Sequence, residues 1–267
     1  MRIPIPAILA SFAACLAVGC GGNPSFSTPE RMDSGLVIIL PGIEGESGFN
    51  RDIRRGLEAT ALRRAIPIRS WGPQVPLFGM LVNQTNFLGN RLIGASIAKE
   101  IVAYQNEYPG RPVHVIGHSG GGGIAVFVAE SLPDDHPIDG LVLLSASISS
   151  GRDLTKALSH CKNGIINFYA PGDPLLSAGT ALMGNVCGTH GPGAGLNGFT
   201  SPGEKASPET KLAYTKLYQI RLRPEMVNGD GVGHTSGTDH DFVYYHVAPW
   251  VFSALWPPVD SQASLGK

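Results

Sequence analysis

Short apolar runs alternate with helix-like segments along most of the chain, and this alternation most restricts its fold. Most of the runs are rich in β-branched residues and lack regularly spaced polar positions, which is typical of strands buried on both faces. Buried strands separated by helices favour a mainly parallel, doubly wound α/β sheet with helices on both faces. About six strands are predicted, at residues 36–40, 66–71, 113–117, 140–147, 164–170 and 215–224.

The chain length favours one large domain over two small ones. The 267 residues, 43% of them hydrophobic, can build one substantial core. We assign residues 35–267 to this domain, with residues 176–210 as a long surface loop and a final helix broken near Pro249. The net charge of −1 provides no electrostatic basis for nucleic-acid binding.

The first 34 residues have the pattern of an export signal followed by a linker. Arg2 precedes an apolar stretch too short for a comfortable membrane span, which predicts a signal peptide over residues 1–19. The stretch ends in "LAVGC", which resembles the lipobox of bacterial lipoproteins. That resemblance implies lipid attachment at Cys20, a flexible tether over residues 20–34 and a place in the cell envelope. Ordinary signal cleavage and a retained membrane anchor remain alternatives.

Beyond Cys20, the chain contains only Cys161 and Cys187. In an exported chain two remaining cysteines commonly pair, so we expect a disulfide between them. The alternative is two buried thiols.

Residues 113–130, "VHVIGHSGGGGIAVFVAE", place a glycine cluster between a predicted strand and a predicted helix. Gly117 to Gly121 have the form G-x-S-x-G. A serine on a sharp strand-to-helix turn needs glycine on both sides, because neighbouring side chains would clash there. We therefore predict that Ser119 is a nucleophile whose hydroxyl projects above the sheet.

A phosphate-binding loop and a purely structural turn are the alternatives for this cluster. Consecutive glycines at a helix start could present backbone N–H groups to an anion. A Walker-type loop, however, requires Lys and Ser/Thr after the glycines, and here Gly123 leads into Ile124. A dinucleotide-binding loop requires glycine where Ser119 stands.

A nucleophilic serine requires a base and an acid that orients the base. Asp173 follows the predicted strand at 164–170, so it lies at the carboxyl end of the sheet, where catalytic groups gather. Asp153 is the second candidate, although its position suits a helix cap.

Three histidines follow the last predicted strand. His234 lies in a glycine-flanked polar loop from which its ring can reach the sheet edge, so we predict that it is the base. His240 falls near the first turn of the final helix and is the alternative. His246 lies within that apolar helix and is interpreted as structural.

Backbone N–H groups are expected to form an oxyanion hole beside the serine. Gly120, directly after Ser119, is the first predicted donor. The loop "LPGIEGES" after the first strand supplies the second, from Ile43 or Glu44, with Ile43 preferred. A simple turn is the alternative for this loop.

Together these segments resemble the α/β-hydrolase fold from about residue 35 to residue 256. The resemblance rests on "GHSGG", "LPGIEGES", "PGDPLL" and "GVGHTSG". It implies a Ser119–His234–Asp173 triad that transfers acyl groups to water, without a metal or cofactor. The sequence departs from the family in its small number of strands and in the absence of a large cap insertion, which favours an open site.

Cleavage of a carboxylic ester, from a small molecule or a lipid, is the leading functional hypothesis. An acyltransferase, thioesterase or amidase using the same residues is the alternative within enzymes. A catalytically silent binding module is the alternative outside them.

Gly122 and Gly123 have no role in a five-residue elbow, and each should weaken the helix start by about 1 kcal/mol. We therefore expect other chain segments to pack closely against that turn.

Overall fold

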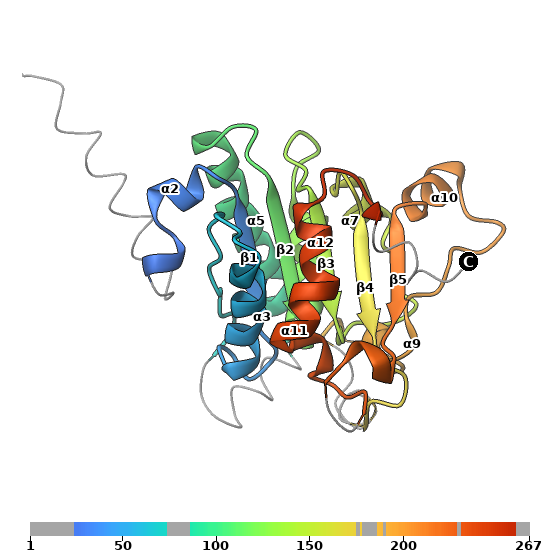
Figure 1. Ribbon diagram of the computed structural model, residues 1–267. Coiled ribbons are helices and arrows are strands. Elements are labelled where there is room, and N and C mark those ends of the chain that lie inside the picture. The colour runs from blue at the N-terminus through green and yellow to red at the C-terminus, as the bar shows by residue number, and fades with distance from the viewer. Residues whose placement is uncertain are drawn as a thin grey trace, which may run out of the picture.

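The computed structural model describes residues 24–73, 86–174, 177, 186–188, 191–228 and 231–259 (Figure 1). Five parallel strands form one sheet in the order of the chain, which confirms the predicted parallel α/β sheet. The strands are β1 (Leu36–Leu40), β2 (Val113–His118), β3 (Gly140–Leu144), β4 (Ile165–Tyr169) and β5 (Leu217–Arg221). The sixth expected strand, at 66–71, is reduced to two isolated bridges on β1, Leu36 with Ala65 and Ile39 with Ile68.

Helices connect the strands and cover both faces of the sheet. The longer ones are α3 (Gly48–Ala59), α5 (Phe87–Glu107), α6 (Gly120–Ser131), α7 (Thr155–Ser159), α10 (Pro208–Tyr214) and α12 (Ala248–Phe252). The remaining helical turns are η1 (Pro24–Phe26), α2 (Pro29–Met32), α9 (Ala194–Asn197), η2 (Pro224–Met226), η3 (Ser236–Thr238), α11 (His240–Phe242) and the π-helical η4 (Val243–Val247).

Each strand divides its side chains between two hydrophobic cores. In β1, Leu36, Ile38 and Leu40 pack with α5 and α6, whereas Val37 and Ile39 pack with α3 and the C-terminal helices. Successive strand residues point to opposite faces, so a strand with helices on both sides must be apolar throughout. In Figure 1, α3, α11 and α12 lie in front of the sheet and α5 lies behind it.

The final helix is irregular where the sequence predicted a break. A π-helical turn at Val243–Val247 separates α11 from α12, which contains Pro249 in its first turn. Proline lacks an N–H and its ring clashes with the carbonyl four residues earlier, so a widened turn before it avoids the clash. This run still buries Trp250 and Val251 against the sheet.

The predicted surface loop at 176–210 contains one helix, α9, and the start of a second, α10, and the sequence revealed neither. Asn167 of β4 donates a hydrogen bond to the carbonyl of Ala194 in α9 (3.0 Å). The Tyr214 hydroxyl of α10 accepts from the Leu154 backbone N–H (2.9 Å). Both helices are short and gain their stability from these tertiary contacts rather than from helical periodicity.

The segment after residue 23 packs on the domain, whereas the sequence indicated a flexible tether as far as residue 34. The backbone N–H of Ile66 donates to the carbonyl of Phe26 (2.9 Å). Arg31 of α2 pairs with Glu58 of α3 through both guanidinium nitrogens (2.7 and 2.9 Å). The predicted signal peptide and Cys20 lie outside the described residues. Within the described ranges, no helix is long and apolar enough to cross a bilayer.

The expected disulfide is wrong: Cys161 and Cys187, both described, are not joined. Cys161 precedes β4 and is fully buried at the amino ends of the strands, and burial raises the pKa of its thiol to about 12. Val186, adjacent to Cys187, bonds to Ser147 beyond the carboxyl end of β3. A five-residue strand spans about 16 Å, more than the roughly 7 Å that a disulfide bridges.

Burial of two histidines in β2 predicts that stability falls in acid. Burial lowers the pKa of both His114 and His118 to about 3. Below pH 6.5 the unfolded chain binds protons that the folded chain does not, so the free energy of unfolding decreases as pH falls towards 3. The expected slope is up to about 1.4 kcal/mol per pH unit for each histidine.

Urea unfolding at pH 7, 5.5 and 4.5 measures this slope. His114→Gln is expected to remove the His114 share of the pH dependence. A variant with the slope of the wild type would contradict the assignment of this dependence to His114.

Candidate active site

Ser119 occupies a strained turn between β2 and α6. Its φ of 53° and ψ of −122° lie outside the ordinary regions for a residue with a side chain. The end of β3 holds this turn in place: the Ser119 N–H donates to the Leu144 carbonyl, and the Ser147 N–H donates to the Ser119 carbonyl, both at 2.9 Å. Local strain of this kind persists only where surrounding contacts enforce it.

The glycines after Ser119 allow close packing against three segments, as the sequence predicted. A Cβ atom on Gly121 would lie 2.2 Å from the carbonyl oxygens of Leu40 and Pro41. On Gly122 it would lie 2.6 Å from Ala146 Cβ, and on Gly123 2.1 Å from a methyl of Val186. All three distances are shorter than a van der Waals contact, so the cluster is required for packing at the helix start.

The structure brings Ser119, His234 and Asp173 together at the carboxyl edge of the sheet. The Ser119 hydroxyl lies 2.9 Å from His234 Nε2, and His234 Nδ1 lies 2.6 Å from an Asp173 carboxylate oxygen. A carboxylate can only accept, so Nδ1 carries the proton and the neutral ring accepts from Ser119 through Nε2. Asp173 is fully buried, whereas the His234 side chain is 11% exposed.

These three residues follow three different parallel strands. Ser119 follows β2, Asp173 follows β4 and His234 follows β5. Because the carboxyl ends of parallel strands meet at one edge, residues 115 positions apart in the chain become hydrogen-bonded neighbours.

Asp153 and His240, the alternative acid and base, make their hydrogen bonds outside the group of Ser119, His234 and Asp173. Asp153 is exposed and accepts from the backbone N–H and hydroxyl of Thr155 (2.8 and 2.6 Å), which suits its role at the start of α7. His240 begins α11, is partly exposed and pairs with Asp241 at 2.8 Å. His246 packs on Phe242 within the last helical run, and burial lowers its pKa.

His118 is a neighbour of this group to which the sequence reasoning assigned no role. Its ring is 2% exposed and its centroid lies 5.2 Å from that of His234. Its Nε2 lies 3.4 Å from the His234 carbonyl oxygen, which can only accept, so Nε2 carries the proton. Burial holds the pKa of His118 near 3, so the ring stays neutral and places no positive charge beside His234. In the sequence, the only indication of a role for His118 is its position within the G-x-S-x-G motif, directly before Ser119.

The loop after β1 lies directly against the elbow. A Cβ atom on Gly120 would lie 2.7 Å from an Ile43 methyl. The Trp71 indole N–H donates to the Pro41 carbonyl (2.7 Å), and the Gly45 N–H to the Gly42 carbonyl (3.1 Å), which together shape this loop. The two predicted oxyanion donors therefore belong to segments in contact beside Ser119.

Within the described part of the chain, no group of three His, Cys, Asp or Glu side chains could hold a metal ion. The described polar groups beside Ser119 are an imidazole, a buried carboxylate and backbone amides. A hydroxyl with this arrangement can lose its proton to the imidazole as it attacks an electrophile.

No protein-family model matches the chain, and no curated protein matches it either. Among solved structures it is similar to MenH from S. aureus, with 11% identity and a TM-score of 0.46 over 82% of this chain and 93% of that one. Esterase PE8 has 13% identity and a TM-score of 0.45, and the match covers 75% of this chain and 85% of that one. The thioesterase domain from the curacin biosynthetic pathway has 11% identity and a TM-score of 0.43, and the match covers 85% of this chain and 93% of that domain.

These structural similarities are too distant to assign a fold class or a function. We therefore assign the fold class from the sheet of this chain. Five parallel strands lie in chain order, and helices cover both faces. Ser119 stands on a strand-to-helix turn at the carboxyl edge, before Asp173 and His234 in the chain. The chain therefore has a doubly wound parallel architecture consistent with an α/β-hydrolase fold.

Proposed function

We propose that the protein is a serine hydrolase that cleaves a carboxylic ester through an acyl-enzyme. The observation that carries this proposal is the pair of hydrogen bonds linking Ser119, His234 and Asp173. A buried carboxylate that orients an imidazole, which in turn accepts from a serine, is the arrangement of a nucleophilic triad.

In this mechanism Ser119 attacks the ester carbonyl while His234 Nε2 takes the hydroxyl proton. Asp173 holds the ring in the tautomer that can accept this proton and stabilises the imidazolium that forms. The N–H groups of Gly120 and Ile43 stabilise the oxyanion of the tetrahedral intermediate. His234 then protonates the leaving alcohol, and water, activated by the same ring, releases the acyl group and restores Ser119.

Nitrophenyl esters of graded chain length, combined with a fluorophosphonate probe, test this proposal. Turnover of at least one ester and covalent labelling of Ser119 are expected. A folded protein that hydrolyses none of the esters and is never labelled would instead be a silent binding module. Thioester or amide turnover that exceeds ester turnover would reassign the substrate class.

Replacing the two candidate bases separately is expected to have unequal effects. His234→Ala should lower kcat by about 10⁴-fold or more, because Ser119 loses its proton acceptor. His240→Ala should change kcat by less than about twofold, because His240 pairs with Asp241 outside the triad. Steady-state kinetics on one nitrophenyl ester measures both, and the reverse order of effects would transfer the role to His240.

We also propose that the chain is exported and that Cys20 carries a lipid. Two sequence features support this proposal: the apolar stretch before Cys20, and the small residues of "LAVGC" that lead into it. Labelled palmitate should enter the full chain, and Cys20→Ser should abolish the incorporation.

A further inference from the structure

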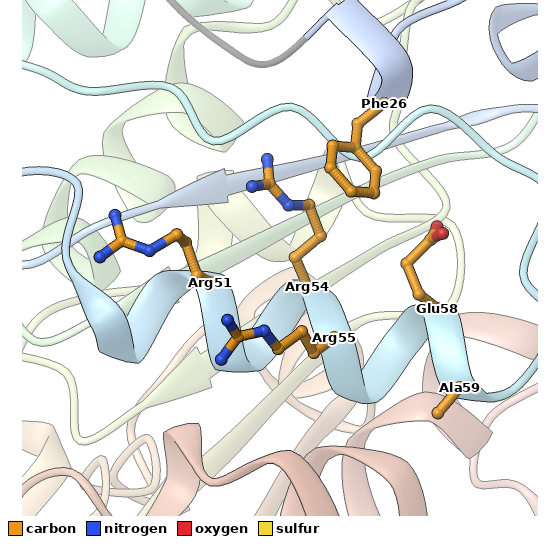
Figure 2. A pocket seen from close by; sticks show the side chains of 6 residues that line it. All are labelled: Phe26, Arg51, Arg54, Arg55, Glu58 and Ala59. Atoms are coloured by element: carbon orange, nitrogen blue, oxygen red, sulfur yellow. The ribbon is translucent and has the colours of Figure 1, made fainter.

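A surface hollow of about 500 Å³ lies beside α3, away from Ser119 and its partners. Figure 2 shows its lining: Arg51, Arg54 and Arg55 extend from α3, and Phe26 of η1 lies beside the Arg54 guanidinium. The lining residues are Phe26, Arg51, Arg54, Arg55, Glu58 and Ala59.

Four arginines, Arg31, Arg51, Arg54 and Arg55, lie in or beside this hollow. Three of the arginines, among the described residues, each have one acidic partner within 4 Å. The pairs are Arg31–Glu58 at 2.7 Å, Arg51–Glu46 at 3.8 Å and Arg55–Asp52 at 2.6 Å. Arg54 is the member of this group that has no such partner among the described residues.

Arg54 is 7% exposed, yet within the described chain no carboxylate lies within ion-pair distance of it. Its guanidinium carbon lies 4.0 Å from the centre of the Phe26 ring, which provides a cation–π contact. Burial lowers the pKa of Arg54, which reflects the cost of removing this cation from water. Glu46 and Glu58 attract this cation from beyond ion-pair distance and offset only part of the cost, so an anion in direct contact with the guanidinium would offset more of it.

The spacing of the arginines suits a phosphate group better than a carboxylate. Arg51, Arg54 and Arg55 stand at i, i+3 and i+4, so their side chains share one helix face. A carboxylate offers two coplanar oxygens, which one guanidinium can occupy. A phosphate offers up to four oxygens in a tetrahedron and can accept from several guanidinium groups at once. The Phe26 ring would border the organic part of such a ligand.

We propose that this hollow binds the phosphate group of an organic phosphate ester, with Arg54 as its central ligand and Arg51 and Arg55 at the rim. A membrane lipid and a soluble phosphate ester present the same chemistry. Phe26 follows Cys20 by six residues, a reach of at most about 20 Å. An acylated Cys20 would therefore hold the hollow close to lipid headgroups.

Calorimetric titration of the full chain tests this site with glycerol 3-phosphate and with monomeric dihexanoyl phosphatidylglycerol. Saturable binding of at least one of them is expected, and Arg54→Gln should weaken it at least tenfold. Arg111→Gln is the matched control, because it removes the same charge from an exposed pair with Asp33. It should change affinity by less than twofold.

Arg55→Gln serves as a second variant because the Arg55 side chain is 69% exposed and its loss should not disturb folding. It should weaken binding about threefold, with an unchanged circular dichroism spectrum and melting temperature. Preference for the lipid assigns the site to a membrane surface, and preference for glycerol 3-phosphate assigns it to a soluble ester. Absence of binding, equal weakening by Arg54→Gln and Arg111→Gln, or acetate binding as tight as phosphate-ester binding would overturn the proposal.

Discussion

Ser119→Ala is expected to lower ester turnover by roughly 10⁵-fold and to abolish labelling by a fluorophosphonate probe. The hydroxyl lies 2.9 Å from His234 Nε2, so its removal leaves the imidazole without a nucleophile to activate. Loss of one small, nearly buried polar atom should leave the fold intact. Steady-state kinetics and mass spectrometry of the labelled protein measure the two effects.

Ser145→Ala is the matched control for this experiment. Ser145 is a second buried serine with positive φ at the carboxyl edge of the sheet, and its hydroxyl has no described hydrogen-bond partner. Its replacement should change kcat by less than about threefold. Retention of full ester turnover in Ser119→Ala would end the hydrolase proposal, whatever the control shows.

Gly121→Ala is expected to destabilise the fold by about 3 kcal/mol or more, or to prevent soluble expression. The new Cβ would lie 2.2 Å from the carbonyl oxygens of Leu40 and Pro41, which are backbone atoms of β1 and the following loop. Backbone at the end of a buried strand cannot move aside as a flexible side chain can, so the helix start must shift. Urea unfolding followed by circular dichroism measures the loss.

Gly48→Ala provides the comparison, because Gly48 also lies in the first turn of a helix, α3. A Cβ atom there meets nothing within 4 Å. Alanine favours the helix by up to about 1 kcal/mol relative to glycine, so this variant should be as stable as the wild type or slightly more stable. Equal stabilities for the two variants would show that the contacts around Gly121 do not restrict the elbow.

The parallel α/β architecture could be predicted because the hydrophobicity of short sequence segments indicates it directly. Runs such as "LVIIL" at 36–40 are apolar at every position, which in itself indicates strands covered on both faces. Because these strands are apolar at every position, polar and apolar residues do not alternate along them. The sequence therefore does not show which side chains face which of the two cores. The helices at 194–197 and 208–214 were missed because they are short and held by contacts with β4 and α7.

The disulfide expectation failed for a related reason. Composition and compartment suggested pairing of Cys161 with Cys187, but neither contains information about distance. Opposite ends of the sheet separate the two cysteines, and only the path of the chain determines that.

The sequence by itself determined the parallel α/β architecture, the strained turn at Ser119 and the requirement for glycine around it, because each follows from side-chain size and backbone conformation in one short segment. Only the tertiary structure decided which acid and which histidine meet that serine. Asp173 and His234 lie 61 residues apart and His234 and Ser119 115 residues apart, and their hydrogen bonds form only because the loops after β2, β4 and β5 converge at one edge. That Arg54 has no carboxylate within ion-pair distance among the described residues is equally a property of the fold, because it arises where η1 and α2 pack against α3.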